Sequence, residues 1–373
     1  MWRYAIAAVA AACICAACGN GSPGSSAEEA AADTLEIAVV DTVGIMMGDS
    51  AYVFGNITDA ALSEDGDLYV LDGLRCRLGI YSPDGEHREF VGRQGAGPEE
   101  YQYPRSFALA DDGSVVVCDW GGISVTHLTP DLALDTILTG YSHIAPDRIV
   151  PTSDGDYVGM SLTHRVEEGA PAGENFIARF GRSEEPEVVY CSYPMRFSRG
   201  PDGDLNVHTT ALTWDTGPDG SVWVAVVSDS TRAFTGYTAS GATIAAVSEP
   251  WQRREKTEEE LAEGYEHETL STSAESGNAV RRNRRFEDIP RYHNAISDIE
   301  VDDRGRIWVA AGHTEVPTFD VYDSRGQRLF VARIPGLENE EGLAYCFDHG
   351  MIGFDTQPED YPRVYVLETV EGG

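Results

Sequence analysis

Short apolar or alternating runs recur along the chain, and a polar residue followed by glycine separates many of them. This pair occurs as Asp65-Gly66, Asp112-Gly113, Asp154-Gly155, Asp219-Gly220, Arg304-Gly305 and His349-Gly350. Glycine adopts positive φ without steric cost and Asp tolerates it, so each pair predicts a tight two-residue hairpin between strands. The pattern therefore predicts an all-β structure built from six copies of one unit.

The spacing of these glycines predicts the architecture. Successive intervals are 47, 42, 65, 85 and 45 residues, and a four-stranded propeller blade takes about 40 to 50. We predict a six-bladed β-propeller over residues 34–373, with insertions where the intervals are long. The excess after Gly155 is expected in residues 165–175 and 193–204. The excess after Gly220 is expected in residues 252–291, where Thr257 and Glu260 have the spacing of a capping box and predict a short helix between blades four and five.

One family resemblance supports this architecture. Residues 69–85 run from a strand ending in Tyr-Val-Leu-Asp, through a turn with Arg75, to a second Asp-Gly hairpin at Asp84. This stretch resembles the NHL repeat, and residues 92–98 resemble that family's linker between blades. The resemblance covers about residues 55–140 and 295–330. It implies a place among the bacterial six-bladed propeller lipoproteins.

The two ends of the domain suggest how the ring closes. Residues 35–40 and 363–367 both alternate as strands, and both lie outside the six hairpins. An open ring would leave two unpaired sheet edges. We therefore predict that the N-terminal strand completes the sixth blade beside the C-terminal strands.

Charge restricts the range of partners. The chain has 62 Asp and Glu residues against 27 Lys and Arg residues, a formal net charge of -35. Such a surface excludes general binding to nucleic acid. A protein or a small molecule remains open as the partner.

The N-terminus has the pattern of an export signal. Residues 5–17 are an apolar run of 13, too short to span a bilayer as a helix but suited to a signal peptide. The run ends at Cys15-Ala16-Ala17-Cys18, which resembles a bacterial lipobox with Cys15 in place of the usual leucine. This predicts a signal peptide over residues 1–17, lipidation of Cys18 as a membrane anchor and a flexible tether over residues 18–33. Because Gly19 is not Asp, the resemblance implies an outer-membrane lipoprotein of the cell envelope; the alternative is secretory cleavage near Ala17.

The remaining cysteines show no metal or redox spacing. They are expected to be small apolar residues on strands, with one disulfide as the alternative. These residues are Cys76, Cys118, Cys191 and Cys346.

The central channel is where ligands usually bind in a propeller, and the innermost strand of each blade begins near its mouth. Counting back seven and eight residues from each hairpin glycine finds five charged residues: Asp59, Arg105, Asp147, Arg148 and Asp298. The two arginines could bind a carboxylate, phosphate or sugar. Alternatively, the charges pair with one another around a water-filled channel.

The carboxylates and histidines of the chain are possible ligands for calcium and for zinc. Asp59, Asn294 and Asp298, with Asp147, offer hard oxygen ligands for calcium, as in lactonase-type propellers, although the early Glu-Gly-Pro motif of the gluconolactonase relatives is missing. Zinc is not expected, because no two histidines have a ligand spacing. The histidines considered are His127, His143, His164, His208, His293 and His313.

The insertion holds a dense basic cluster, Arg281, Arg282, Arg284 and Arg285. It could dock an acidic partner or pair with the acidic residues 255–263, and both interpretations remain open. The sequence as a whole favours a binding or scaffold module at the envelope without a required cofactor. The alternative is a calcium-dependent hydrolase or lyase of the lactonase type.

Overall fold

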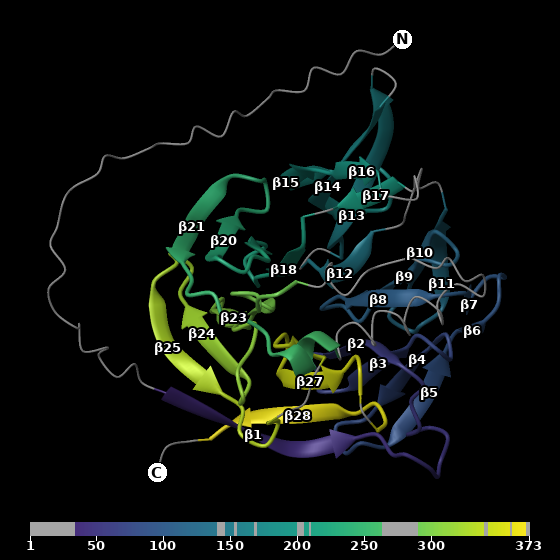
Figure 1. Ribbon diagram of the computed structural model, residues 1–373. Coiled ribbons are helices and arrows are strands. Elements are labelled where there is room, and N and C mark those ends of the chain that lie inside the picture. The colour runs from purple at the N-terminus through teal and green to yellow at the C-terminus, as the bar shows by residue number, and fades with distance from the viewer. Residues whose placement is uncertain are drawn as a thin grey trace, which may run out of the picture. The chain divides into compact units, whose positions relative to one another are not determined.

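The computed structural model describes residues 34–139, 146–152, 155–167, 170–199, 205–208, 210–262, 290–338, 342–358 and 360–370. Within these residues the strands form six sheets of four, arranged in a ring (Figure 1). The first sheet comprises β2 (Ile57–Leu62), β3 (Leu68–Asp72), β4 (Arg77–Tyr81) and β5 (His87–Val91). The second comprises β8 (Pro104–Leu109), β9 (Val115–Asp119), β10 (Ser124–Leu128) and β11 (Leu134–Leu138). The third comprises β12 (Asp147–Pro151), β13 (Tyr157–Glu167), β14 (Ala170–Phe180) and β15 (Val188–Pro194).

The second half of the ring follows the same order. The fourth sheet contains β18 (Leu212–Thr216), β19 (Val222–Val226), β20 (Thr231–Tyr237) and β21 (Thr243–Pro250). The fifth contains β22 (Asp298–Val301), β23 (Ile307–Ala310), β24 (Thr318–Tyr322) and β25 (Arg328–Arg333). The sixth contains β26 (Leu343–Cys346), β27 (Met351–Asp355), β28 (Val364–Thr369) and β1 (Thr34–Val43). The predicted six-bladed all-β propeller is therefore the observed fold.

The strand β1 joins the last two sheets. It pairs antiparallel with β28, from Ile37 opposite Thr369 to Val43 opposite Val364. Its first residues also pair in parallel with β25, from Thr34 opposite Val331 to Glu36 opposite Arg333. The outer strand of the sixth sheet thus comes from the opposite end of the chain.

The hairpin glycines have the predicted positive φ, but the loops are longer than two residues. In the first sheet Gly66 has a φ of 80°. There, Ser63 N–H bonds Asp67 O at 2.9 Å, and Gly66 N–H bonds Ser63 O at 2.8 Å. This is a three-residue loop with glycine in the left-handed position of a bulge, and the two-residue expectation was wrong. The same pair of bonds recurs around Gly113, Gly155, Gly220 and Gly305.

Most of the core lies between neighbouring sheets, because a single blade has apolar side chains on both faces. Between the fourth and fifth sheets, Trp223, Phe234, Ile299 and Tyr322 belong to one buried cluster. The rings of Phe234 and Tyr322 meet edge to face with centroids 4.9 Å apart. Burying each such side chain stabilises the fold by about 1.5–3 kcal/mol. The four cysteines on the described strands and turns are free thiols, and Cys76 and Cys118 are buried.

The longer intervals correspond to extensions of the ring. The strands β13 and β14 have 11 residues each and pair as far as Glu167 opposite Ala170. A separate hairpin follows, formed by β16 (Arg196–Arg199) and β17 (Leu205–His208). The linker after the first sheet pairs β6 (Arg93–Gln94) with β7 (Glu100–Tyr101).

Only part of the predicted insertion is described, and residues 258–262 within it are helical. The four arginines 281, 282, 284 and 285 lie outside the described residues, as do the predicted signal peptide, Cys18 and the tether. No helix in the described part of the chain is long and apolar enough to cross a membrane.

Candidate functional site

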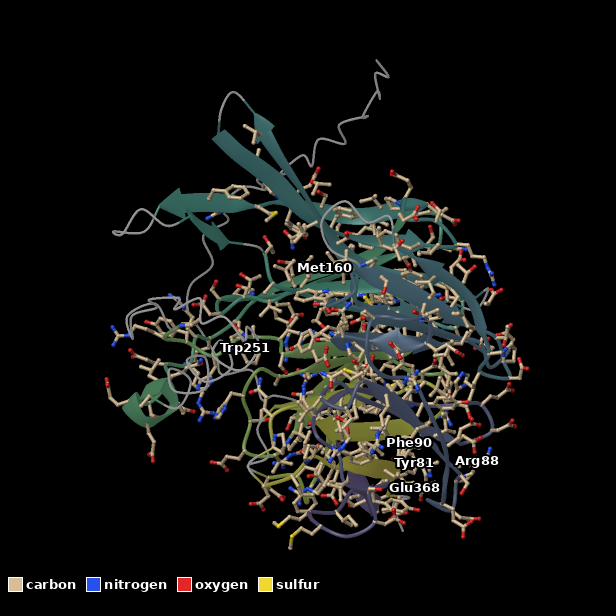
Figure 2. The ribbon with its side chains drawn as sticks, turned by 90° about the vertical axis from the view of Figure 1, so that its right-hand side faces the viewer. Tyr81, Arg88, Phe90, Met160, Trp251 and Glu368 are labelled. Atoms are coloured by element: carbon tan, nitrogen blue, oxygen red, sulfur yellow. The ribbon has the colours of Figure 1, made fainter. Side chains whose placement is uncertain are left out.

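Six strand starts converge on one face of the ring. The innermost strands β2, β8, β12, β18, β22 and β26 begin at, or one residue before, the residues found by counting back from the hairpin glycines. Because strands alternate in direction within each blade, the loops of residues 251–257, 290–297 and 311–317 lie on this same face, which we call the mouth face. Figure 2 shows Trp251 there, on the side from which the helix of residues 258–262 projects.

Arg148 is the centre of a charge network that joins three blades. Its guanidinium lies 2.7 Å from Asp298 Oδ1 and 2.9 Å from Glu300 Oε1. It also donates to the Thr213 hydroxyl, which in turn donates to Asp298 Oδ1 at 2.5 Å. Although burial lowers the pKa of Arg148, these carboxylates outweigh burial and raise it above its ordinary range. The guanidinium of Arg148 therefore binds side chains of the protein itself.

Arg105 lies in the neighbouring blade and has different surroundings. Its Nε is 3.8 Å from Asp147 Oδ1, and its Nη1 donates to the Tyr103 hydroxyl at 3.2 Å. The guanidinium carbon also lies 5.4 Å from the ring centre of Trp120. Burial raises the pKa of Asp147, and Arg105 opposes that shift. Since 35% of the Arg105 side chain is exposed, water reaches this part of the channel.

Two inner-strand aspartates tie neighbouring blades together. Asp59 accepts from Phe107 N–H at 3.0 Å and from Ala60 N–H at 2.9 Å. Asp215 accepts from Val301 N–H at 2.6 Å and from Thr216 N–H at 2.8 Å. Burial raises the pKa of each carboxyl to about 7, and the backbone donors only partly oppose it.

Sequence reasoning missed two members of this network. Glu300 follows Asp298 by two residues, and Asp215 follows Thr213 by two, so each lies on the same face of its strand. Burial and the nearby Asp215 and Asp298 raise the pKa of Glu300 well above its ordinary value, against the effect of Arg148. Counting back from each hairpin glycine and then moving two residues further along the inner strand would have found both Glu300 and Asp215.

The expected calcium ligands do not form one cluster. The oxygens of Asp59 accept backbone N–H groups, and Asp298 Oδ1 is engaged by Arg148 and Thr213. Asn294 lines a different feature, described next. In the described residues, neither Asp59 nor Asp298 belongs to a group of three His, Cys, Asp or Glu residues with ligand atoms within 4.8 Å of one another. Four of the five predicted channel charges instead form two pairs, Arg105 with Asp147 and Arg148 with Asp298, whereas Asp59 accepts backbone donors.

A cavity of about 560 Å³ opens on the mouth face beside the insertion. We call it the insertion cavity; its lining residues are Trp251, Gln252, Arg253, Arg254, His293, Asn294 and His313. Trp251 and the two arginines follow the last strand of blade four, whereas the histidines and Asn294 come from loops of blade five. Its volume is within the range of small-molecule sites.

The surroundings of this cavity are locally basic. Arg253 contacts the Tyr292 ring, with 3.8 Å between the guanidinium carbon and the ring centre, and pairs with Asp229. Burial lowers the pKa of His293, and the positive charges of Lys256 and Arg254 act in the same direction. A chain with a net charge of -35 therefore has a group of cations at this opening.

Three further side chains converge at the cavity wall. Glu260 Oε1 lies 3.2 Å from His293 Nε2 and 3.6 Å from His313 Nε2. The imidazole rings are stacked, with centroids 4.1 Å apart. The residues come from three separate segments, so no ligand spacing in the sequence could have revealed them.

The comparisons with known proteins agree on the fold class. A family described as a 6-bladed beta-propeller, DUF5128, matches residues 51–125. No curated protein sequence is significantly similar to this chain. The sheets and the family match together define a six-bladed β-propeller.

Solved structures are similar only at a distance. Virginiamycin B lyase from Staphylococcus aureus has 10% identity and a TM-score of 0.47, covering 90% of this chain and 100% of its own. A Bacteroides fragilis protein described as exported has 12% identity and a TM-score of 0.46, covering 91% and 100%. A gluconolactonase from Xanthomonas campestris has 16% identity and a TM-score of 0.40, covering 90% and 98%. No activity is carried over from such distant similarities.

Proposed function

We propose that this protein is an exported propeller, anchored through lipidated Cys18, that binds a small anionic ligand on its mouth face. The observation that carries the binding role is the insertion cavity, which combines an aromatic ring, two arginines and two imidazoles in about 560 Å³. The cavity is lined by Trp251 and otherwise by polar and basic side chains, and convergent polar groups of this kind fix the orientation of a ligand in a small-molecule site.

The ligand class follows from charge. Arg253 and Arg254 both line the cavity, and guanidinium groups bind carboxylates and phosphates through paired N–H donors. Trp251 adds a flat surface for the rest of the ligand. The wider surface is acidic and repels anions, so a bound anion has to be small enough to interact mainly with the cavity.

The channel network supports a binding role over catalysis in the ring. Arg148, Asp298 and Asp59 are already engaged with partners from other blades. Groups held in this way make the ring rigid, and a rigid scaffold that positions loops is the usual arrangement of a binding site.

The binding role is tested by calorimetry of the purified protein with succinate, citrate and inorganic phosphate. We expect at least one of these anions to bind, and the Arg253→Ala/Arg254→Ala double variant to bind it at least tenfold more weakly, about 1.4 kcal/mol. The matched control is Arg182→Ala, which removes an exposed arginine paired with Asp135 elsewhere on the ring. Absence of binding, or equal weakening by the control, would contradict the proposal.

The anchor is tested separately by labelling with a radioactive fatty acid in a bacterial host. The wild-type chain is expected to be labelled and to fractionate with membranes, whereas Cys18→Ser is expected to be neither. An unlabelled wild-type chain released in soluble form would favour cleavage near Ala17 instead.

A further inference from the structure

The geometry of Glu260, His293 and His313 is that of a metal site. A tetrahedral zinc ion with bonds of about 2.0–2.1 Å keeps its ligand atoms about 3.3 Å apart. The observed separations from Glu260 Oε1 to the two Nε2 atoms, 3.2 and 3.6 Å, are close to that value. All three ligand atoms lie within 4.8 Å of one another.

An independent observation also suggests a missing ligand. His293 is only 9% exposed, and its Nε2 makes no hydrogen bond within the described structure although the Glu260 carboxylate is near. A buried polar atom without a hydrogen bond is unfavourable by roughly 1–3 kcal/mol. A metal ion between the three groups would satisfy this atom.

A simple ion pair explains the arrangement less well. If Glu260 were present only to pair with charged histidine, the second imidazole would be redundant. Two neutral imidazoles beside one carboxylate oxygen instead provide two lone pairs and one negative charge.

Local structure holds the acidic ligand in place. Glu260 Oε2 accepts from Thr257 N–H at 2.6 Å, and Glu260 N–H donates to the Thr257 hydroxyl at 3.2 Å. This is the predicted capping box, and it uses one carboxylate oxygen and leaves Oε1 beside the histidines. Leu261 of the same helix is buried, with 4% of its surface exposed.

The two histidines are also positioned by their backbones. His293 N–H donates to Arg254 O at 3.0 Å, which ties the return of the insertion to its start. Gly312 lies so close to the other loop that a Cβ there would be 2.0 Å from Asn294 O. Glycine at this position therefore allows the loop that carries His313 to approach His293.

We propose that Glu260, His293 and His313 bind one divalent transition-metal ion of the zinc class, with the remaining coordination position open to the insertion cavity. Two imidazole nitrogens and one carboxylate are the ligands of open zinc sites, whereas calcium and magnesium prefer oxygen alone. The inference rests on these three side chains and does not depend on the anionic ligand. An ion here would add a further attraction for an anion in the same cavity.

The test uses purified protein treated with a chelator and then titrated with Zn²⁺ against a chromophoric competitor. We expect one equivalent to bind, and His293→Ala, His313→Ala and Glu260→Gln each to weaken binding about a hundredfold or more. Cobalt titration gives a second readout, because a four-coordinate Co²⁺ ion with nitrogen ligands has strong visible absorption that these variants should remove.

The matched control is His349→Ala. His349 belongs to a second cluster with Asp303 and Asp348, away from the insertion cavity. The inference is wrong if this control abolishes zinc binding and the three cavity variants do not. It is also wrong if the wild-type protein binds no zinc. His313 is 31% exposed on a loop, so its variant is expected to fold even if His293→Ala does not.

The two proposals fail separately. Anion binding that persists in metal-free protein, together with no zinc binding, would overturn the metal site alone. Zinc binding that depends on the three residues, together with no anion binding by the loaded protein, would overturn the proposed ligand alone.

Discussion

The channel network and the insertion cavity share the mouth face, yet their polar groups are satisfied in different ways. In the channel, Arg148 of blade three is paired with carboxylates of blade five, and Asp59 accepts backbone donors from its own and the next blade. In the cavity, His293 Nε2 lacks a hydrogen bond and arginines line the opening. Paired charges hold blades together in the channel, whereas the cavity combines Arg253, which is paired with Asp229, with a buried imidazole nitrogen that makes no hydrogen bond. The comparison shows that the channel charges are structural, and it leaves the insertion as the place where we propose that a ligand binds.

The largest expected effect is on ring closure. A chain beginning at residue 48 lacks β1 and leaves the edges of β25 and β28 without their partner. We expect it to self-associate and to lose its cooperative thermal transition, because exposed edges pair with other chains. Light scattering and calorimetry measure both effects, with a chain beginning at residue 34 as the control. A monomer with an unchanged Tm would contradict closure by β1.

The second-largest effect is expected on stability when a charge of the channel network is removed. Arg148→Met leaves Asp298 and Glu300 without their cation, and unpaired buried charges destabilise by about 3–5 kcal/mol. Because 34% of the Arg148 side chain is exposed, we expect the lower end, about 3 kcal/mol in urea unfolding. Adding Asp298→Asn and Glu300→Gln should restore most of the loss. Equal stability of wild type and single variant would show that the network contributes little.

A smaller effect is expected on the pH dependence of stability. Burial raises the pKa of folded Asp59 to about 7 from an ordinary 3.8, so between these values the folded state retains a proton that the unfolded chain has released. Its contribution to stability is therefore present below about pH 4 and is lost as the pH rises to about 7. Asp59→Asn removes this term, so the stability of the variant relative to wild type should rise over that range. The full shift corresponds to roughly 4 kcal/mol, but Asp59 is only partly buried and solvent screening reduces the expected rise to on the order of 1–2 kcal/mol. The exposed Asp41→Asn variant is the control, and parallel pH profiles for wild type and Asp59→Asn would refute the assignment.

The smallest effect on the ring is expected from the insertion. Thr257→Ala removes the cap of the helix of residues 258–262, a loss of about 1 kcal/mol confined to that segment. Global unfolding should stay within about 0.5 kcal/mol of wild type, while zinc affinity falls about tenfold because Glu260 is no longer oriented. Thr257→Ser should restore the affinity. A variant that binds zinc as well as wild type would show that the cap does not position Glu260.

The fold could be predicted because its signals are local. Each Asp-Gly turn fixes a hairpin, and the interval between turns fixes the size of a blade, so six blades followed from spacing alone. The length of these loops could not be predicted, because the same Asp-Gly pair, such as the one at Gly66, suits both a two-residue turn and a three-residue loop. The distinction depends on which backbone groups bond across the hairpin.

The candidate site could be predicted only in part. Arg148 and Asp298 were found because strand starts recur at a fixed distance from each turn. The pairing between them was one of two interpretations, since sequence does not show which charges meet across the channel. His293 and His313 have no ligand spacing in the sequence, and only the fold brings the two loops that carry them together with Glu260 on the short helix.

The double pairing of β1 also has a consequence for when the domain can fold. This strand is the first part of the ring to be synthesised, and its partners β25 and β28 are among the last. The ribosome must therefore release nearly the whole chain before the ring can close. Contacts between such distant residues form slowly, so the seam between the two ends of the chain is the last part of the ring to become ordered.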